Sequence, residues 1–549
     1  MKWFPLCNYT HYSLQKGFSK PRELAKKCRD NSYPACGIAD YKSLSGAVAF
    51  YQACIANDIK PIIGCSFDNF ALFAKNKSGW LELIRIVSTL DESDEIDQDL
   101  LIELSNRGNM ICIARAEIFS PIPSDSGNFY KKTEAFPDTY YVEKDQAVLH
   151  RVLLCSGMKT TLPKVKQAIA KAKKNDPVEN QIFFETNDFY LKDKQETAKM
   201  LVDDPKMDVF SEIFSKVENY NILNKPMLPS FPYLHGMSEK DYLIGLCSQG
   251  WDRMVENGEI TDKNEQEYRK RYERELEVID GADLSGYFLI VWDILNFCRR
   301  KGWMVGPGRG SAAGCLISYL IGITLIDPIL YDLLFERFYN AGRNTEDHIS
   351  LPDIDMDVPG GKRDEIIAQL KEKYGADNVS QMCTFGRLQG RSAIKEVLRV
   401  NEACGFGEMN EITRYIPDEA AISDQLQQMD EEDRSIIRWA LENNTEELRD
   451  YCHIDEDEEL KGDYAEYFRQ AIDIEGTFKT QGKHAAGVVI SALPLHEACP
   501  MVNQKSGGDK IAGLEMDDLE ALGHVKFDVL AVNLLDKLMY TQELVDDNS

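Results

Sequence analysis

The first 225 residues alternate short apolar runs with longer segments that mix apolar and polar positions. The apolar runs at residues 37–40 and 60–67 are typical of buried strands, and residues 47–58 between them are typical of a helix. Because strands and helices repeat in turn, the pattern predicts an α/β unit that resembles a barrel.

The pattern changes after a proline-rich linker at residues 226–236. Helical segments follow, and one of them places Phe288, Val291, Trp292 and Leu295 on one face. We interpret this aromatic and aliphatic stripe as core rather than as a surface for stacking bases.

The second half of the chain predicts a helix at residues 362–374, a strand at 379–386 and a helix at 387–400. Residues 401–478 are polar and acidic and have a helical pattern throughout. A buried strand is expected after them.

Residues 305–358 carry the clearest chemical signal. A glycine-rich turn at residues 306–311 precedes an apolar segment of small residues, and a turn before a helix exposes backbone N–H groups that can hold phosphate. The alternative is a tight turn that only allows close packing. At the other end, Asp353 and Asp355 alternate with apolar residues, which predicts a strand with both carboxylates on one face, able to share divalent cations. Together these features predict two-metal phosphoryl or nucleotidyl transfer.

Two later segments add candidate ligands. Lys526 and Asp528 share one strand face by the same spacing. Lys483 and His484, flanked by glycine and alanine, are expected at the mouth of a buried strand. The alternative is a tight strand entry without a ligand role.

The composition sets the class of protein. With 549 residues and 43% hydrophobic content, the chain can form three or four domains. The sequence has no apolar run of about 18 residues and no signal-peptide pattern, so we expect a soluble protein with no membrane partner. The 14 cysteines lack CxxC spacing, which favours reduced thiols in a cytosol-like compartment.

The formal charge of −28 argues against nucleic-acid binding by the whole surface, although binding needs only one basic groove. Much of the acid is concentrated at residues 430–433 and 455–459. We interpret these clusters as solvated faces, with a partner-binding role as the alternative.

The chain carries six motifs in order, at 306–314 (GPGRGSAAG), 333–338 (LLFERF), 351–357 (LPDIDMD, followed by KRDEII), 384–397 (TFGRLQGRSAIKEV), 482–490 (GKHAAGVVI) and 525–528 (VKFD). Their order and approximate spacing resemble those of family C bacterial replicative DNA polymerases, the DNA polymerase III alpha subunits. Residues 10–17, 37–64 and 186–191 resemble the polymerase and histidinol phosphatase (PHP) domain that opens these proteins.

The resemblance implies a multidomain α/β and α+β protein. It implies a PHP-like α/β barrel at residues 1–230, a nucleotidyltransferase-like palm with a polymerase beta-type mixed sheet at 231–400 and 479–549, and a helical thumb at 401–478 inserted in the palm. The implied activity is DNA-templated DNA polymerisation during replication, in the cytoplasm of a bacterium or of a phage-infected host.

The resemblance also implies the site. Asp353, Asp355 and Asp528 would hold two Mg²⁺ ions and act in catalysis. The positions that match nucleotide ligands of the family are Gly310, Ser311, Arg337, Arg391, Lys483, His484 and Lys526. For Arg337 a structural salt bridge is the alternative, and at Arg391 and Lys395 the family's arginine and lysine types are exchanged.

The PHP-like domain departs from the family at its metal ligands. Cys7 and Tyr9 replace the first two histidines, and the replacements at the other ligand positions are Tyr41, Ser66 and Tyr190. We therefore expect no metal cluster there and interpret the domain as a structural scaffold without phosphoesterase activity. The alternative is a single ion held by Cys7, Asp40 and Asp188.

Family members continue beyond the segment that matches this sequence into fingers, a duplex-binding region, a clamp-binding peptide and an OB-fold. We therefore expect either a fragment of a longer polymerase or one half of a split enzyme. The expected partners are primer–template DNA, dNTP, a second polypeptide that supplies fingers and C-terminal domains, and a sliding clamp reached through it. The alternative function is a catalytically inactive, polymerase-like scaffold of a replisome.

Overall fold

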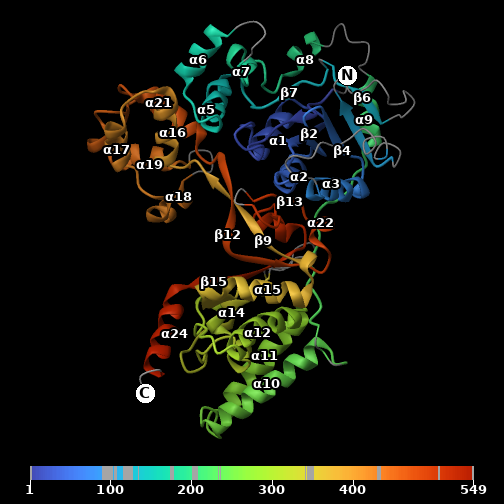
Figure 1. Ribbon diagram of the computed structural model, residues 1–549, viewed down its shortest axis with the longest axis vertical. Coiled ribbons are helices and arrows are strands. Elements are labelled where there is room, and N and C mark those ends of the chain that lie inside the picture. Colours follow the sequence, from blue (N-terminus) through green and yellow to red (C-terminus); the bar gives the residue numbers. More distant parts are fainter. Residues whose placement is uncertain are drawn as a thin grey trace. The chain divides into compact units, whose positions relative to one another are not determined.

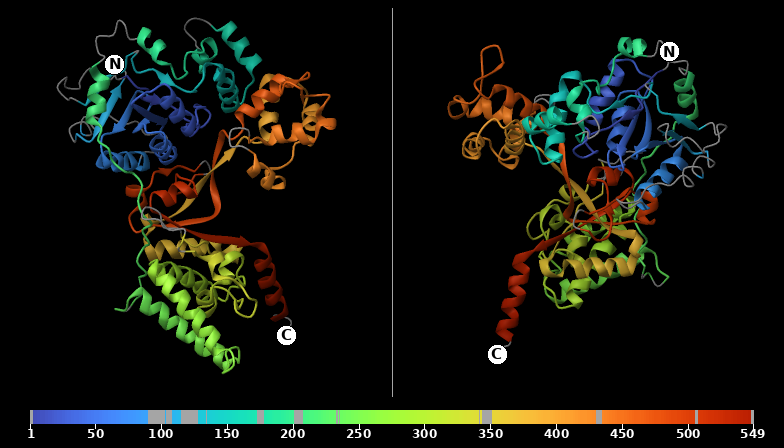
Figure 2. Two further views of the ribbon diagram at one scale, coloured as in Figure 1. Left: turned by 180° about the vertical axis from the view of Figure 1, so that it is seen from behind. Right: turned by 45° about the horizontal axis from the view of Figure 1, so that its top comes forward.

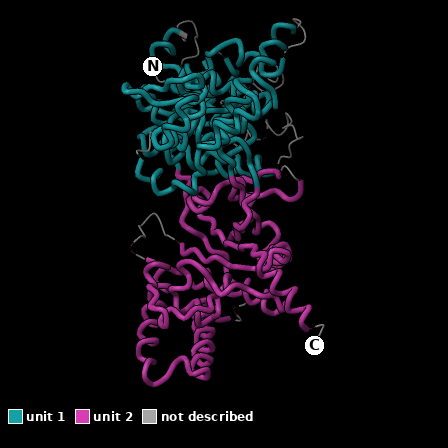
Figure 3. The backbone as a smooth tube through the Cα atoms, turned by 90° about the vertical axis from the view of Figure 1, so that its left-hand side faces the viewer, with its two compact units in different colours: residues 1–220, 385–482 teal, residues 221–384, 483–549 magenta. Residues whose placement is uncertain are grey.

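The protein forms two compact units, each built from two separate stretches of sequence (Figure 3). Unit 1 comprises residues 1–220 and 385–482, and unit 2 comprises residues 221–384 and 483–549. The predicted multidomain α/β class is confirmed. The computed structural model describes residues 3–89, 103, 108–114, 128–133, 135–172, 178–200, 208–232, 234, 236–340, 342, 351–429, 434–504 and 507–546.

The first stretch of unit 1 contains a five-stranded mixed sheet in the order β2-β3-β4-β5-β6 (Figure 1). Its strands and flanking helices are β2 (Ala35–Tyr41), β3 (Lys60–Ser66), β4 (Phe70–Ala74), β5 (Met110–Ala114), β6 (Phe129–Lys131), α1 (Pro21–Asp30), α2 (Ala47–Ala56) and α3 (Lys77–Thr89). The parallel strands β2 and β3 are joined by α2, as the sequence pattern predicts. A parallel pair, β1 (Cys7–Asn8) with β7 (Asp138–Thr139), lies beside β2, because the Gly37 N–H donates to the Pro5 carbonyl (2.8 Å).

The rest of unit 1 is mainly helical. Its helices are α5 (Ala147–Gly157), α6 (Leu162–Lys171), α7 (Gln181–Glu185), α8 (Lys194–Met200), α9 (Asp208–Lys216), α16 (Arg391–Asn401), α17 (Phe406–Arg414), α18 (Ser423–Gln428), α19 (Ile436–Asn443), α20 (Thr445–Leu448) and α21 (Ala465–Ile474). Helices α16 and α21 pack against α5. Buried side chains from both stretches, among them Val152, Leu398 and Phe468, therefore form one continuous hydrophobic core.

The acidic cluster at residues 455–459 is a hairpin turn rather than a helix. It joins the antiparallel strands β10 (His453–Ile454) and β11 (Leu460–Lys461). One carboxylate oxygen of Asp455 accepts the backbone N–H groups of Asp457 (3.0 Å) and Glu459 (2.9 Å), and such local bonding favours a turn over a helix. The expectation of a helical pattern throughout 401–478 is wrong at this point. Residues 430–433, the other acidic cluster, lie outside the described residues.

Unit 2 is built on a six-stranded mixed sheet in the order β13-β14-β9-β12-β15-β8. Its strands are β8 (Asp355–Pro359), β9 (Val379–Arg387), β12 (Phe478–Ile490), β13 (Met501–Val502), β14 (Ile511–Ala512) and β15 (Val525–Val532). Both β9 and β12 continue into unit 1. The predicted strand at 379–386 is confirmed by β9.

Unit 2 also contains α-helices, of which α24 projects from the end of β15 (Figures 1 and 2). They are α10 (Glu239–Glu256), α11 (Glu265–Gly281), α12 (Ser285–Arg300), α13 (Leu316–Leu320), α14 (Phe335–Phe338), α15 (Arg363–Tyr374), α22 (Leu495–Ala498), α23 (Met516–Ala521) and α24 (Asn533–Asp546). In α12 the stripe Phe288, Val291 and Leu295 is buried in the core of the unit, as predicted, while Trp292 is half-buried. In the described part of the chain, no helix combines the length and apolar character needed to cross a bilayer.

The shared core of unit 1 predicts the effect of truncating Phe468, a fully buried side chain of α21. We expect Phe468→Ala to lower the free energy of unfolding by about 3–5 kcal/mol, through lost burial and a residual cavity. Hydrogen exchange should show lost protection both in α16 and in α5, because the two helices share the core. Lost protection confined to residues 385–482 would contradict a common core.

Candidate active site

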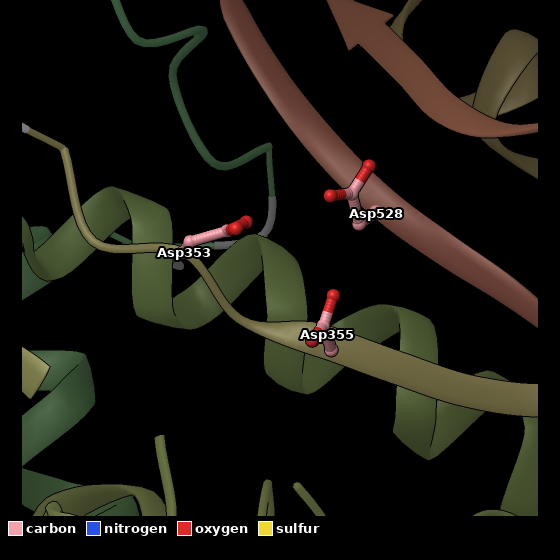
Figure 4. Close-up of side chains that lie close together, drawn as sticks. All are labelled: Asp353, Asp355 and Asp528. Carbon is pink, nitrogen blue, oxygen red and sulfur yellow. The ribbon is translucent and has the colours of Figure 1, made fainter. Parts of the chain in front are cut away.

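Two neighbouring strands bring the acidic side chains together. Strands β8 and β15 pair in parallel, and Asp355 is the register partner of Asp528. Asp353 lies two residues before β8. One carboxylate oxygen from each of the three residues lies within 4.8 Å of the others, and Figure 4 shows the three side chains converging. The alternation predicted for this strand is present, since Ile354 and Met356 are buried.

The three carboxylates differ in exposure. The side chain of Asp353 is 59% exposed, whereas that of Asp528 is 9% exposed. Burial raises the pKa of Asp355, and the negative charges of Asp353 and Asp528 raise it further. Among the described residues, Asp528 Oδ1 is buried without a hydrogen-bond partner.

This donor set fits a divalent cation. Hard cations such as Mg²⁺ take oxygen ligands, and a buried carboxylate oxygen without a partner is costly unless something binds it. A cation would satisfy Asp528 Oδ1 and offset the repulsion among the three carboxylates. The geometry does not identify the metal, but it supports a site for one at these residues.

Lys526 acts here as the counter-ion of the carboxylates. Its side chain is almost buried, and Nζ lies 2.8 Å from Asp528 Oδ2 and 3.9 Å from Asp353 Oδ1. The ammonium also approaches Met516 Sδ (3.0 Å). The sequence predicts Lys526 as a nucleotide ligand, and that role stays a prediction.

Tyr287 of α12 supports the backbone between Asp353 and Asp355. The Ile354 N–H donates to the Tyr287 hydroxyl oxygen (3.2 Å), and the tyrosine ring stacks on Phe527 of β15 (5.3 Å between centroids). Tyr287 thus connects Ile354, the residue before β8, with β15. Sequence reasoning missed this residue, because by its position in α12 a tyrosine looks like any other buried aromatic side chain.

The glycine-rich turn lies along β8. The Gly306 N–H donates to the Asp357 carbonyl (3.0 Å), and Arg309 forms a two-pronged ion pair with the Asp357 carboxylate. Gly310 has a left-handed φ of +61°, and a Cβ added there would lie 3.9 Å from Asp355 Oδ2. The turn is therefore directly adjacent to a carboxylate of the cluster.

The predicted helix after this turn is interrupted. A 3₁₀ helix, η3 (Gly310–Gly314), is followed by the five-residue α13. The first turn of α13 is occupied by protein groups, because the Ile317 N–H donates to the buried Glu275 carboxylate (3.0 Å). The phosphate site stays a prediction, and the residues of the turn that remain exposed for it are Gly310 and Ser311 at the start of η3.

Arg337 and Arg391 lie in different surroundings. Arg337 is exposed on α14, which packs against η3 so closely that a Cβ added at Gly314 would lie 2.7 Å from the Leu334 carbonyl oxygen. Arg391 belongs to unit 1, where its guanidinium donates to the Ile416 carbonyl and lies 3.4 Å from Asp418. Arg391 thus belongs to a different unit from the three aspartates. The nucleotide-binding role of Arg391 stays a prediction.

Lys483 and His484 lie within β12 rather than at its mouth. Lys483 is exposed. His484 Nδ1 accepts the N–H of Gly487 (2.8 Å), and Gly487 is the register partner of Asp528 on β15. His484 is therefore hydrogen-bonded to the residue, Gly487, that pairs with Asp528 of β15.

The PHP-like positions in unit 1 have acquired structural partners. Asp40 is fully buried, and its carboxylate accepts bonds from the Thr10 N–H (2.7 Å), the Thr10 hydroxyl (2.7 Å) and the Ser13 hydroxyl (2.6 Å). Burial raises the pKa of the Cys7 thiol to about 12. Asp188 is exposed, and its carboxylate accepts a hydrogen bond from the Thr186 hydroxyl (2.6 Å). The buried Asp40 carboxylate thus serves as a hydrogen-bond acceptor within the protein.

Comparison with known proteins agrees with this geometry. Residues 241–531 match the model of the bacterial DNA polymerase III alpha NTPase domain, and residues 6–141 match the PHP domain. The chain therefore belongs to the bacterial DNA polymerase III alpha family.

Relatives named DNA polymerase III subunit alpha extend along the whole sequence. The protein from Borreliella burgdorferi is 30% identical over 98% of this chain and 49% of its own length. Those from Pseudomonas aeruginosa and Escherichia coli K12 are each 28% identical over 98% of this chain and 48% of theirs. The chain spans about half the length of the curated relatives it matches.

The carboxylate cluster predicts metal binding that depends on Asp528. We expect the wild-type protein to bind Mn²⁺, and Asp528→Asn to weaken binding at least about tenfold because one of three anionic ligands is lost. Isothermal titration measures this affinity. Asp364→Asn, an exposed aspartate at the start of α15, is the control and should bind Mn²⁺ as the wild type does. Equal affinities in all three proteins would contradict the site.

Asp40 predicts a pH dependence of stability. Burial raises its pKa from 3.8 to about 6, so the folded protein holds the proton more tightly than the unfolded chain. This contribution is fully present below about pH 4 and is lost as the pH rises through 6, a change of about 3 kcal/mol. Asp40→Asn keeps an oxygen acceptor for Thr10 and does not titrate, so urea unfolding should show a flatter pH profile.

The control for this profile is Asp188→Asn, at an exposed position that also corresponds to a family metal ligand. It should change the unfolding free energy by less than about 0.5 kcal/mol across the same pH range. If Asp40→Asn has the same pH dependence of the unfolding free energy as the wild type, Asp40 is not the group responsible for it.

Proposed function

We propose that this protein is a DNA-templated DNA polymerase that transfers a nucleotide from a dNTP to a primer 3′-hydroxyl during replication. The observation that carries the proposal is the convergence of Asp353, Asp355 and Asp528 on adjacent parallel strands, with the glycine-rich turn alongside. Family membership supports the same reaction. The relatives named as polymerase III alpha subunits supply the substrate class.

In the proposed mechanism the three aspartates hold two Mg²⁺ ions, which would activate the primer hydroxyl and neutralise the triphosphate. Asp528 and Asp355 face each other across β15 and β8, so the sheet fixes their separation. Asp353, the most exposed of the three, would be the one that substrate reaches most easily. Lys526 holds Asp528 and Asp353 in place through its ammonium group.

The triphosphate would lie along the turn and its neighbours. Gly310 and Ser311 offer backbone and hydroxyl donors, and the exposed cations Arg337 and Lys483 would offset negative charge on the phosphates. The further proposed ligands are His484, Lys526 and Arg391. The template base would select the incoming nucleotide by pairing.

We propose that the PHP-like domain is a scaffold without phosphoesterase activity. The Asp40 carboxylate is engaged by Thr10 and Ser13, and the core that α5 shares with α16 and α21 supports a structural role.

We also propose a protein partner that supplies fingers and C-terminal functions, through which a sliding clamp would be reached. Helix α24, which continues from β15 (Figure 2), supports a protein contact because it exposes several apolar side chains. These are Leu534, Leu538, Tyr540, Leu544 and Val545.

Primer extension tests the proposed activity. The assay uses a primed template, Mg²⁺ and dNTPs, with the purified protein alone and then with lysate from its source. We expect extension that Asp355→Asn lowers at least about a thousandfold, because that carboxylate holds the metal ions. Asp364→Asn should extend as the wild type does. Extension retained by Asp355→Asn would refute the catalytic assignment, and extension under neither condition would favour an inactive scaffold.

A further inference from the structure

A buried ion pair on α11 touches three segments around the glycine-rich turn. Glu275 is fully buried, and its Oε1 accepts a bond from Arg271 Nε one helical turn earlier (2.6 Å). Its Oε2 accepts the Ile317 N–H at the start of α13 (3.0 Å) and the Cys315 thiol (3.3 Å). Every oxygen of the carboxylate is therefore engaged.

The guanidinium completes the bridge. Arg271 Nη2 donates to the Gly314 carbonyl at the end of η3 (2.6 Å) and to the Leu333 carbonyl (3.0 Å). Leu333 lies two residues before α14, which carries Arg337. One planar donor group thus connects the segment that begins with Gly310 to the segment that presents Arg337.

The same helix carries a pair with the same spacing but different surroundings. Arg269 and Glu265 also lie one turn apart at 2.6 Å, yet both are exposed. An exposed pair of this kind contributes little to stability, and a buried pair must first overcome the cost of removing two charges from water. A gain in stability from the ion pair is therefore not enough to explain why Glu275 is buried and Arg271 is half-buried.

We propose that Arg271 and Glu275 are positioning residues that fix the separation between the phosphate-binding turn at Gly310 and the arginine at position 337. The inference rests on the proposed function, because both segments are proposed triphosphate ligands. Neither residue touches substrate. They act on the positions of the two segments through hydrogen bonds to the Gly314 and Leu333 carbonyls and to the Ile317 N–H.

The test compares dNTP affinity in variants of α11. Arg271→Lys keeps the charge next to Glu275 but lacks the planar fork that reaches two carbonyls. We expect KM for dNTP to rise about tenfold, with kcat changed less than about threefold and KM for primer–template unaltered. Glu275→Gln, which keeps the shape and weakens the bond to Arg271, should shift KM in the same direction.

Two controls separate positioning from general destabilisation. Arg269→Lys makes the same chemical change in the exposed pair and should leave every constant unaltered. Ile279→Val removes one buried methyl group from the same helix and should lower Tm without raising KM for dNTP. A tenfold rise in KM in Ile279→Val, or none in Arg271→Lys, would overturn the proposal.

A binding measurement distinguishes this proposal from the proposed activity. Isothermal titration of dATP with Mg²⁺ needs no turnover. Binding by the wild type and weakening by about tenfold in Arg271→Lys support the positioning role even if no primer is extended. Equal affinity in the two proteins overturns the positioning role alone, and no binding by the wild type overturns both proposals.

Discussion

The parallel pairing of β8 with β15 is the constraint on which the site depends. It places Asp355 opposite Asp528, and because side chains alternate along a strand, a slip of one residue would turn either carboxylate to the other face. The register is held by buried neighbours on the opposite face, Met356 and Val529 among them. The apolar core therefore fixes the acidic cluster, and the repulsion among the carboxylates is opposed by Lys526 from the same sheet.

The three acids of the DIDMD segment have divided roles, although their spacing is uniform. Asp353 and Asp355 turn toward Asp528, whereas Asp357 is neutralised by Arg309 and binds the glycine-rich turn to β8. The same strand thus holds the cation site and the neighbouring turn at a fixed distance. A carboxylate paired with a guanidinium offers fewer free lone pairs to a metal ion, which agrees with its place outside the cluster.

In unit 1, residues at positions predicted to have departed from the family's metal ligands take part in hydrogen bonding and packing. Asp40 has hydrogen-bond donors on both carboxylate oxygens, so it needs no metal to be satisfied. Helix α5, in the same stretch of unit 1, supplies part of the core for α16 and α21. Removal of the domain would expose that core, so packing alone is a reason for its retention.

Local pattern was sufficient for the strand that begins at Asp355, the helix α15 and the core of α12, because each depends on periodicity over a few residues. The partnership of Asp355 with Asp528 joins distant segments, so it came from family resemblance rather than from spacing. The interruption at Cys315 was missed because a buried glutamate from α11 competes for the amides of α13. The pairs Glu265–Arg269 and Arg271–Glu275 are nearly alike as sequence, and only burial in the folded chain makes one a surface contact and the other a bridge.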